Sequence, residues 1–197
     1  MSFLLGLTGS IGMGKSTTTR IFADKGCLTW SADAAVHQLY STGGIAVVQI
    51  KKLFPETVIN GEIDRNRLRE LTLHNTDYLT KIEKIVHPLV KLNRQDFIKK
   101  NNGKILVFDI PLLFEINSQG DFDAVACAST TFELQKERVL ARPGMTKKIF
   151  KTILLKQISS KEKCSRSDYI IDTTDIQKAE ACVETILKDI ERRLKNA

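Results

Sequence analysis

One uninterrupted motif near the N-terminus constrains the fold of this chain more than any other feature. Residues 9–16 read G-S-I-G-M-G-K-S and fit G-x-x-x-x-G-K-[ST], the Walker A phosphate-binding loop. The apolar run at 3–7 suits a buried strand in front of the loop, and a helix is expected from Thr17 onward. Strand, loop and helix in this order predict a P-loop NTPase fold that binds a nucleoside triphosphate.

The chemistry of phosphate binding explains why these residue types occur at this spacing. Glycines let the backbone wrap closely around an oxyanion, and the following helix adds the positive end of its dipole. Lys15 can reach the β- and γ-phosphates, and the Ser16 hydroxyl is placed to bind Mg²⁺. A glycine-rich turn that merely precedes a helix is the alternative, and the Lys-Ser pair argues against it. The expected nucleotide site consists of Gly9, Ser10, Ile11, Gly12, Met13, Gly14, Lys15, Ser16 and Thr17.

Length and composition favour a single soluble domain. At 197 residues the chain can bury a sizeable core and suits one α/β domain with a small insertion. We see no signal-peptide pattern and no apolar run of the roughly 20 residues that span a bilayer. The four cysteines are scattered without a C-x-x-C pair, and the three histidines are equally dispersed. We therefore expect a cytoplasmic protein with reduced thiols and no metal cluster.

The net charge of +7 calls for an anionic partner. Nucleic acid is one candidate, and two polyphosphate ligands bound side by side are another. Nucleic-acid binding predicts aromatic residues interleaved with basic ones, but the basic region 147–166 contains only Phe150. An ATP-dependent nucleic-acid-binding protein is therefore the less favoured interpretation.

Apolar runs alternate with helical periodicity along the chain. Five runs read as strands, at 3–7, 27–31, 105–108, 124–128 and 169–171. The helices between them imply a parallel sheet covered on both faces, with the ligand at the carboxyl ends of the strands. The last helix, which Asp175 is expected to cap, has the clearest apolar face: Ile176, Ala179, Val183, Ile186, Ile190 and Leu194.

The stretch 55–103 looks helical and polar, with no strand-like run. Asp64 is expected to cap one helix and Thr76 or Asp77 another, and Pro88 to open the helix that runs to Gly103. We expect this stretch to hold a phosphoryl acceptor. The expected three-layer domain spans 1–197, with a core of about 1–54, 104–140 and 165–197, an acceptor-binding insertion at about 55–103 and a small helical lid at about 141–164.

The Walker A loop leaves the reaction open, and other segments narrow it. The D-x-x-G and N-K-x-D motifs of GTPases do not occur. The strand at 105–108 ends in Asp109, which could orient Mg²⁺ or simply terminate the strand. It is followed by Ile110 and Pro111 and not by a water-activating Glu. Transfer to a bound acceptor is therefore favoured over hydrolysis.

At this point the chain resembles the dephospho-coenzyme A kinase family nearly end to end. The two most specific segments are the phosphate loop, with Ser10 and Met13 as departures, and D-I-P-L-L-F-E at 109–115. Other segments are weak singly but lie in order at matching intervals. They are S-A-D at 31–33 where the family has D-A-D, I-D-R at 63–65 with Leu68, H-P-L-V at 87–90, Arg138 and Arg142 with M-T at 145–146, Gln157, E-K at 162–163 and D-Y-I-I-D at 168–172.

The resemblance implies transfer of the ATP γ-phosphate to the ribose 3′-hydroxyl of dephospho-coenzyme A, the last step of coenzyme A synthesis. It implies ATP and Mg²⁺ at the site, with no nucleic acid and no membrane as partner. We expect a monomer, and an oligomer is left open. The nearest rival is another small P-loop kinase that acts on a nucleotide, nucleoside or sugar.

Four further side chains could take part in the transfer. Asp33, beyond the second strand, could accept the hydroxyl proton or cap a helix before Ala34, and the resemblance favours the base. Arg65 is the arginine expected to face the substrate, while Arg67 and Arg69 lie elsewhere around the helix. The remaining two, Arg138 and Arg142, are expected at i,i+4 on one helix, either both pointing at the transferring phosphate or as a surface pair.

Overall fold

The computed structural model describes residues 2–73 and 75–196, which form two compact units. The sheet unit comprises the described residues up to 29 and from 101 onward, and the helical unit comprises residues 30–100. The sequence-based division placed residues 30–54 in the core and began the insertion at about 55. The boundary lies at residue 30 instead, because helices α2 and α3 pack on α5, a later helix of the same unit.

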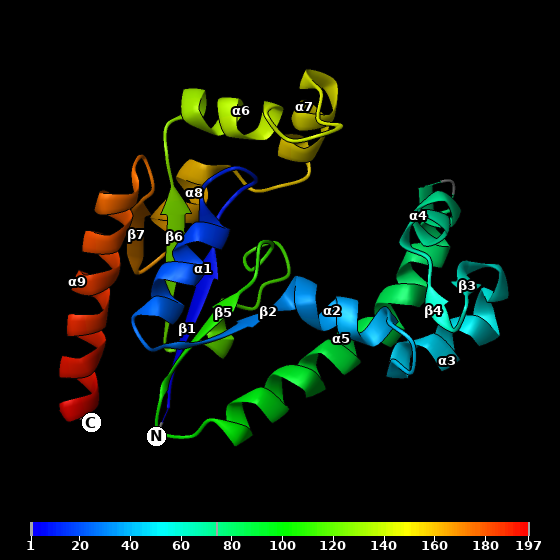
Figure 1. Ribbon diagram of the computed structural model, residues 1–197, viewed down its shortest axis with the longest axis horizontal. Coiled ribbons are helices and arrows are strands. Elements are labelled where there is room, and N and C mark those ends of the chain that lie inside the picture. Colours follow the sequence, from blue (N-terminus) through cyan, green and yellow to red (C-terminus); the bar gives the residue numbers. More distant parts are fainter. Residues whose placement is uncertain (1, 74, 197) are drawn as a thin grey trace. The chain divides into compact units, whose positions relative to one another are not determined.

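The five-stranded sheet that the sequence predicts forms the centre of the sheet unit, and its strand order is β2-β5-β1-β6-β7 (Figure 1). Strand β1 lies between β5 and β6 and is parallel to both, and β7 continues the parallel sheet beside β6. The carboxyl ends of these strands therefore lie at one edge. The strands are β1 (Phe3–Thr8), β2 (Leu28–Ser31), β5 (Ile105–Asp109), β6 (Ala124–Ser129) and β7 (Tyr169–Asp172).

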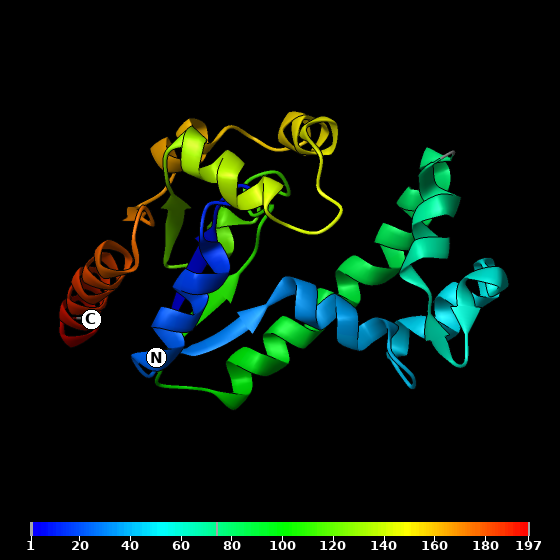
Figure 2. The same ribbon diagram turned by 45° about the horizontal axis from the view of Figure 1, so that its top comes forward.

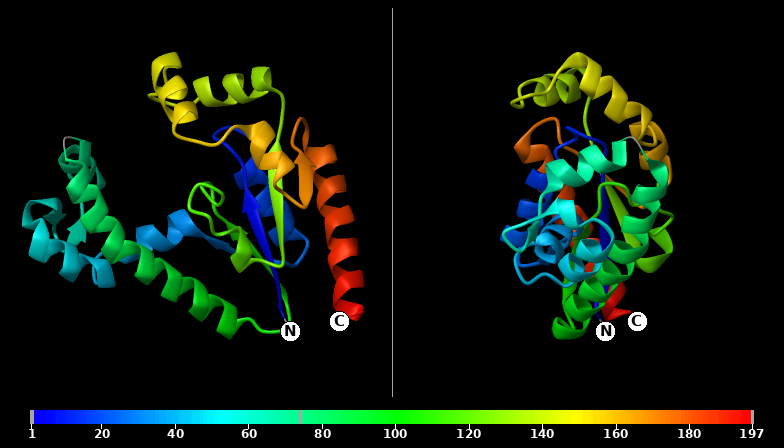
Figure 3. Two further views of the ribbon diagram at one scale, coloured as in Figure 1. Left: turned by 180° about the vertical axis from the view of Figure 1, so that it is seen from behind. Right: turned by 90° about the vertical axis from the view of Figure 1, so that its right-hand side faces the viewer.

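Helices cover both faces of this sheet. On one face α1 (Lys15–Asp24) and α9 (Ile176–Lys195) pack on alternate residues of β1 (Figure 1). The apolar face predicted for α9 is confirmed, since its middle four residues are buried and only Ile176 and Leu194 at its ends are exposed. On the opposite face α8 (Ser160–Ser165) lies against β6 (Figure 3), where Cys164 approaches Cys127 with 3.8 Å between the sulfurs. The same unit includes α6 (Phe132–Leu140), α7 (Lys147–Leu155) and a short 3₁₀ turn at Gln119–Asp121.

The helical unit is built around one long helix, α5 (Thr76–Lys100), beside which the other helices pack (Figures 1 and 2). Its core gathers buried apolar residues such as Leu39, Ile50 and Ile82. The remaining helices are α2 (Ala32–Tyr40), α3 (Ile45–Leu53) and α4 (Arg65–Leu73), with a 3₁₀ turn at Pro55–Thr57.

The prediction of a new helix at Pro88 is wrong, because α5 continues through that residue. Proline removes only one backbone donor, and apolar contacts on both sides hold the helix together: Ile82 and Val86 before it, Leu89 after it. The predicted caps at Thr76 or Asp77 are also wrong. Asn75 carries the cap, since its Oδ1 accepts from the Asp77 N–H at 3.0 Å.

The expectation of no strands between 55 and 103 is wrong as well. Two-residue strands β3 (Val58–Ile59) and β4 (Glu62–Ile63) form an antiparallel hairpin. The turn residues Asn60 and Gly61 both have positive φ, 50° and 83°, as a tight Asn-Gly hairpin turn requires. The hairpin leads into α4, where Asp64 caps the helix as predicted by accepting from the Asn66 and Arg67 N–H groups.

Candidate phosphate-transfer site

The phosphate loop joins β1 to α1, and its glycines are required by close neighbours. Gly12 and Gly14 have positive φ, 77° and 81°. A Cβ at Gly12 would come within 2.5 Å of Val139 Cγ2, and one at Gly14 within 2.8 Å of Thr173. Gly14 is also the N-cap of α1 and provides no side-chain cap. The first N–H groups of α1 are therefore left for another acceptor, as an oxyanion site requires.

Lys15 and Asp109 meet at this loop. The Lys15 ammonium forms an ion pair with Asp109 Oδ1, and Thr19 donates to Oδ2 at 3.2 Å. Only 8% of Asp109 is exposed. The carboxylate at the end of β5 therefore holds the ammonium beside the loop, where the phosphates of a nucleotide would compete for it.

The donor atoms beside the loop fit a magnesium ion bound together with a nucleotide. Ser16, the second residue of α1, is exposed, and the Asp109 carboxylate lies beside its neighbour Lys15. Within residues 2–73 and 75–196 no group of three or more His, Cys, Asp or Glu side chains could hold a metal. Mg²⁺ typically takes one or two protein oxygens and completes its shell with phosphates and water, and a hydroxyl with a carboxylate supplies that set.

Arg138 lies at the loop, whereas Arg142 does not share its helix. The Arg138 guanidinium donates to the Thr173 carbonyl oxygen at 2.7 Å, just beyond β7. Helix α6 ends at Leu140, so the predicted i,i+4 pair is wrong. Pro143 disfavours helical backbone at the residue before it, and a turn closes there instead, with Met145 N–H donating to the Arg142 carbonyl oxygen at 3.1 Å. Arg142 is exposed on this turn.

Three side chains that the sequence did not single out hold the backbone of the loop. Gln135 donates to the Ile11 carbonyl oxygen at 2.7 Å, and Gln157 accepts from the Ile11 N–H at 3.1 Å. Thr173 donates from its hydroxyl to the Met13 carbonyl oxygen at 2.8 Å. Gln157 appeared only as one match in the family resemblance, and the other two give no periodic or motif signal.

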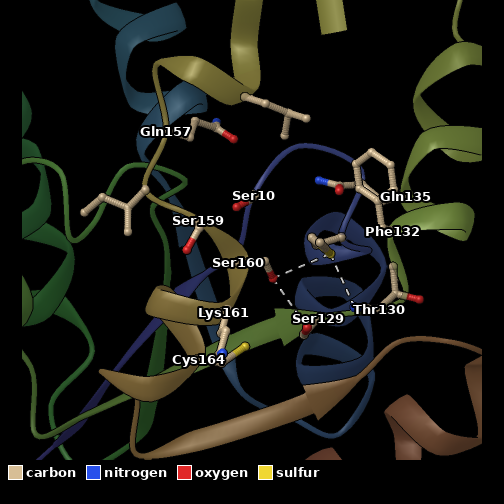
Figure 4. Close-up of a pocket in the computed structure, with 13 residues that line it drawn as sticks. Ser10, Ser129, Thr130, Phe132, Gln135, Gln157, Ser159, Ser160, Lys161 and Cys164 are labelled. Atoms are coloured by element: carbon tan, nitrogen blue, oxygen red, sulfur yellow. Dashed lines mark hydrogen bonds between the residues drawn. The ribbon is translucent and has the colours of Figure 1, made fainter. Parts of the chain in front are cut away.

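A cavity of about 490 Å³ lies beside the loop, with Ser10 and Met13 on its wall (Figure 4). Residues from the end of β6, from α6 and from α8 complete it, among them Thr130, Phe132 and Ser160. The hydroxyls of Ser10 and Thr130 are buried and find no hydrogen-bond partner among the described residues. These two hydroxyls on the cavity wall beside the phosphate loop are therefore free to hydrogen-bond to a ligand.

A buried ion pair anchors the D-I-P-L-L-F-E segment at 109–115. Lys163 is fully buried, donates to the Pro111 carbonyl oxygen at 2.7 Å and lies 2.9 Å from Glu115 Oε1. Glu115 also accepts from the Ile158 N–H at 2.9 Å. Because the charges are paired and hydrogen-bonded, they tie the segment after β5 to the segment that leads into α8.

In the helical unit, Asp33 is exposed in the first turn of α2. The alternative that it caps this helix is wrong, because the Ser31 hydroxyl accepts from the Ala34 N–H at 3.3 Å. Position 31, where the chain departs from the family's D-A-D segment, thus has a structural role as the cap. The Asp33 carboxylate makes no hydrogen bond or ion pair among the described residues.

Arg65 opens α4 and is exposed, with its guanidinium 5.9 Å from the centroid of the Tyr40 ring. Burial raises the pKa of Tyr40, and the charge of Arg65 opposes that rise. Tyr40 ends α2, the helix that begins beside Asp33, so the two predicted side chains lie on packed elements of one unit. The Arg67 side chain makes a different contact, because it donates to the Glu56 carbonyl oxygen at 3.1 Å.

A parallel sheet with a Walker A loop after its middle strand, a lysine held by an aspartate at that loop and an arginine beside it define a P-loop kinase. The profile of one family of these enzymes, described as dephospho-CoA kinase, matches residues 3–178. The chain therefore belongs to the dephospho-CoA kinase family.

Individual relatives agree with this assignment. The chain is 49% identical to the dephospho-CoA kinase of Ruegeria pomeroyi over 190 residues, and this match covers 96% of each chain. The solved structure of TT1252 from Thermus thermophilus matches with a TM-score of 0.84 and 27% identity over 98% of each chain. Dephospho-CoA kinase from Campylobacter jejuni matches with a TM-score of 0.72 and 26% identity, over 98% of this chain and 100% of that one.

Proposed function

We propose that this enzyme transfers the γ-phosphoryl group of ATP to the ribose 3′-hydroxyl of dephospho-coenzyme A and so makes coenzyme A. The observation that carries the proposal is the match to one kinase family over residues 3–178, together with an intact phosphate loop that has Lys15 at its end. The transfer conserves charge and atoms: the acceptor oxygen gains the phosphoryl group, ADP leaves, and the hydroxyl proton passes to a base.

On the donor side, the N–H groups of the loop and of the first turn of α1 bind the phosphates, and Lys15 leaves Asp109 for the β- and γ-phosphates. Arg138 and Arg142 are the cations that would stabilise charge on the transferring group. Ser16 and Asp109 would hold Mg²⁺, which when bound neutralises phosphate charge. The turn at 142–145 joins α6 to α7 and is the segment that would move as a lid to exclude water.

On the acceptor side, Asp33 accepts the proton of the attacking hydroxyl and Arg65 binds an anionic part of the acceptor. Both side chains are exposed, so a ligand can reach them. Positioning and charge stabilisation supply most of the rate in phosphoryl transfer, and a carboxylate that only orients the hydroxyl already fits this chemistry.

Two anionic substrates account for the net charge of +7 without nucleic acid. Among the described residues no helix has both the length and the apolar composition to cross a membrane. The family assignment supports an enzyme that acts on small molecules, and we propose the cytoplasm as its compartment.

An ADP-release assay tests the proposal. Dephospho-coenzyme A, AMP, CMP and gluconate are offered in turn with ATP and Mg²⁺, and a Lys15→Ala preparation corrects for contaminating kinases. We expect dephospho-coenzyme A alone to stimulate ADP release strongly. A larger rate with any of the other acceptors would overturn the proposed substrate.

A further inference from the structure

Both backbone groups of one phosphate-loop residue, Ile11, are bonded by glutamine side chains from distant segments. Gln135 on α6 donates its Nε2 to the Ile11 carbonyl oxygen at 2.7 Å. Gln157, two residues beyond α7, accepts the Ile11 N–H on its Oε1 at 3.1 Å. A carbonyl can only accept and an N–H can only donate, so the chemistry of Ile11 fixes which end of each amide faces it. Gln135 is only 3% exposed, which makes its bond costly to lose.

These bonds determine where the next N–H group points. In a planar trans peptide the C=O and the following N–H point in opposite directions. Because Gln135 holds the Ile11 carbonyl toward α6, the Gly12 N–H points away from α6. Thr173 holds the Met13 carbonyl at 2.8 Å and in the same way directs the Gly14 N–H. Across the described part of the chain, neither of these two N–H groups has a hydrogen-bond partner.

The phosphate loop also packs closely against α6, so its peptide planes have little room to flip. A Cβ on Gly12 would come within 3.0 Å of the Gln135 carbonyl oxygen as well as meeting Val139. Ser10 and Met13 close a turn of their own, with the Met13 N–H donating to the Ser10 carbonyl oxygen at 3.2 Å. Gln157 holds the Ile11 N–H toward itself. The Ser10 carbonyl on the same peptide therefore points away from Gln157, which leaves it free to accept from the Met13 N–H.

We propose that Gln135 and Gln157 are positioning residues, which set the peptide planes of the phosphate loop before the nucleotide arrives. The loop then presents its unpaired N–H groups to phosphate oxygens without having to reorganise, and this lowers the free-energy cost of binding. The proposal rests on the proposed function only in taking ATP as the ligand. It does not depend on the acceptor.

Gln135 donates a hydrogen bond to Ile11 and Gln157 accepts one from it. Replacing each glutamine by glutamate therefore distinguishes the two bonds. Glutamate keeps the size of glutamine and, when ionised, can accept but not donate. Gln135→Glu therefore loses the bond to the Ile11 carbonyl, whereas Gln157→Glu keeps the bond to the Ile11 N–H. Each variant adds one carboxylate near the loop, but Gln135 is 3% exposed and Gln157 is only partly buried, so the charge effects differ. Gln135→Met removes the donor without adding charge and serves as the second test.

The Kd for ATP is measured in the absence of acceptor at pH 8. A fluorescent ATP analogue is titrated first, and ATP then competes with it. The Tm of each variant is measured on the same preparation. We expect Gln135→Glu and Gln135→Met to weaken ATP binding by about tenfold or more relative to Gln157→Glu. The KM for ATP should rise in parallel while the KM for the acceptor stays the same. A residue that only supports packing would lower Tm and leave the Kd of the folded protein unchanged.

Equal losses in Gln135→Glu and Gln157→Glu would overturn the proposal, as would normal ATP binding by Gln135→Met. If Gln135→Glu does not fold, Gln135→Met against wild type decides the question. A wild-type protein that binds ATP but does not phosphorylate dephospho-coenzyme A would refute the proposed function and leave this inference intact.

Discussion

The sheet unit and the helical unit hold their candidate side chains in different ways. In the sheet unit Lys15 is paired with Asp109, and Arg138 is bonded to Thr173. In the helical unit Asp33 and Arg65 are exposed at the starts of α2 and α4, where the helices place them but little else holds them. With the roles proposed above, the donor site would be built in advance, and the side chains of the acceptor site would be ordered by the ligand.

This contrast has an energetic reason. A polyphosphate needs several donors converging on a small volume, and the carboxyl edge of a parallel sheet provides them through fixed backbone. An acceptor hydroxyl needs one correctly placed carboxylate, and ordering one side chain on binding costs only about 0.5–1.5 kcal/mol. Substitution of Lys15 at the phosphate loop should therefore affect ATP binding and transfer together, and substitution of Asp33 in the helical unit should affect mainly kcat.

The largest effect is expected for Lys15→Ala. The ammonium acts on the β- and γ-phosphates, so we expect transfer to fall by about 10³-fold or more. The change also leaves the Asp109 carboxylate with Thr19 as its remaining side-chain donor, so Tm should fall. The double variant Lys15→Ala with Asp109→Asn should recover Tm but not transfer. Recovery of both would mean that Lys15 has only a structural role.

Asp33→Asn should come next, with kcat lower by about 10²–10⁴-fold and smaller changes in either KM. Because Ser31 caps α2, Asp33→Asn should change Tm only slightly, through the loss of one negative charge from the first turn of the helix. Steady-state kinetics with both substrates varied, beside thermal unfolding, makes the test. A normal kcat would remove Asp33 from the mechanism and weaken the view of the helical unit as the acceptor side.

Arg142→Lys should lower kcat by about 10²-fold while ATP binding persists. The variant keeps the charge but loses the planar fork that matches phosphate oxygens. Arg142 is exposed on the turn after α6, so stability should not change. ADP release without acceptor should stay low in wild type if closure needs both substrates. An unchanged kcat would make Arg142 an ordinary surface residue and leave Arg138 as the remaining arginine for the transferring phosphate.

The smallest effect, on stability alone, is expected for Ser31→Ala. Loss of the cap should reduce the free energy of unfolding by about 1 kcal/mol and lower Tm by about 2–4 °C. Activity per folded molecule should remain close to wild type. Thermal unfolding and kinetics on the same preparation compare it directly with Asp33→Asn, two positions along the chain. A large loss of kcat in Ser31→Ala would contradict the separation of cap and base.

The features that the sequence predicted correctly are those with a local signature. The phosphate loop, the five strands and the stripe on α9 each follow from spacing within a short window. Local rules failed where tertiary packing decided the outcome, as when apolar contacts carried α5 through Pro88. The tight turn at Asn60-Gly61 did have a local signal, but the strands beside it are only two residues long.

The site was predictable to a similar degree. Asp109 was expected near the phosphate loop as a possible magnesium residue, because it ends a strand of the same parallel sheet, but its ion pair with Lys15 was not predicted. Gln135 could not be predicted, since its partner is a backbone carbonyl 124 residues away and polar side chains on a helix usually face solvent. Hydrogen bonds between a side chain and distant backbone leave no periodic trace.

Identification of the reaction product tests the central claim most directly. Purified enzyme is incubated with ATP, Mg²⁺ and dephospho-coenzyme A, and the product is separated and examined by ³¹P NMR beside authentic coenzyme A. We predict one new phosphomonoester on the ribose 3′-oxygen, formed mole for mole with ADP and absent with Lys15→Ala. Phosphate on another hydroxyl, or ADP with free phosphate and unchanged dephospho-coenzyme A, would contradict the account.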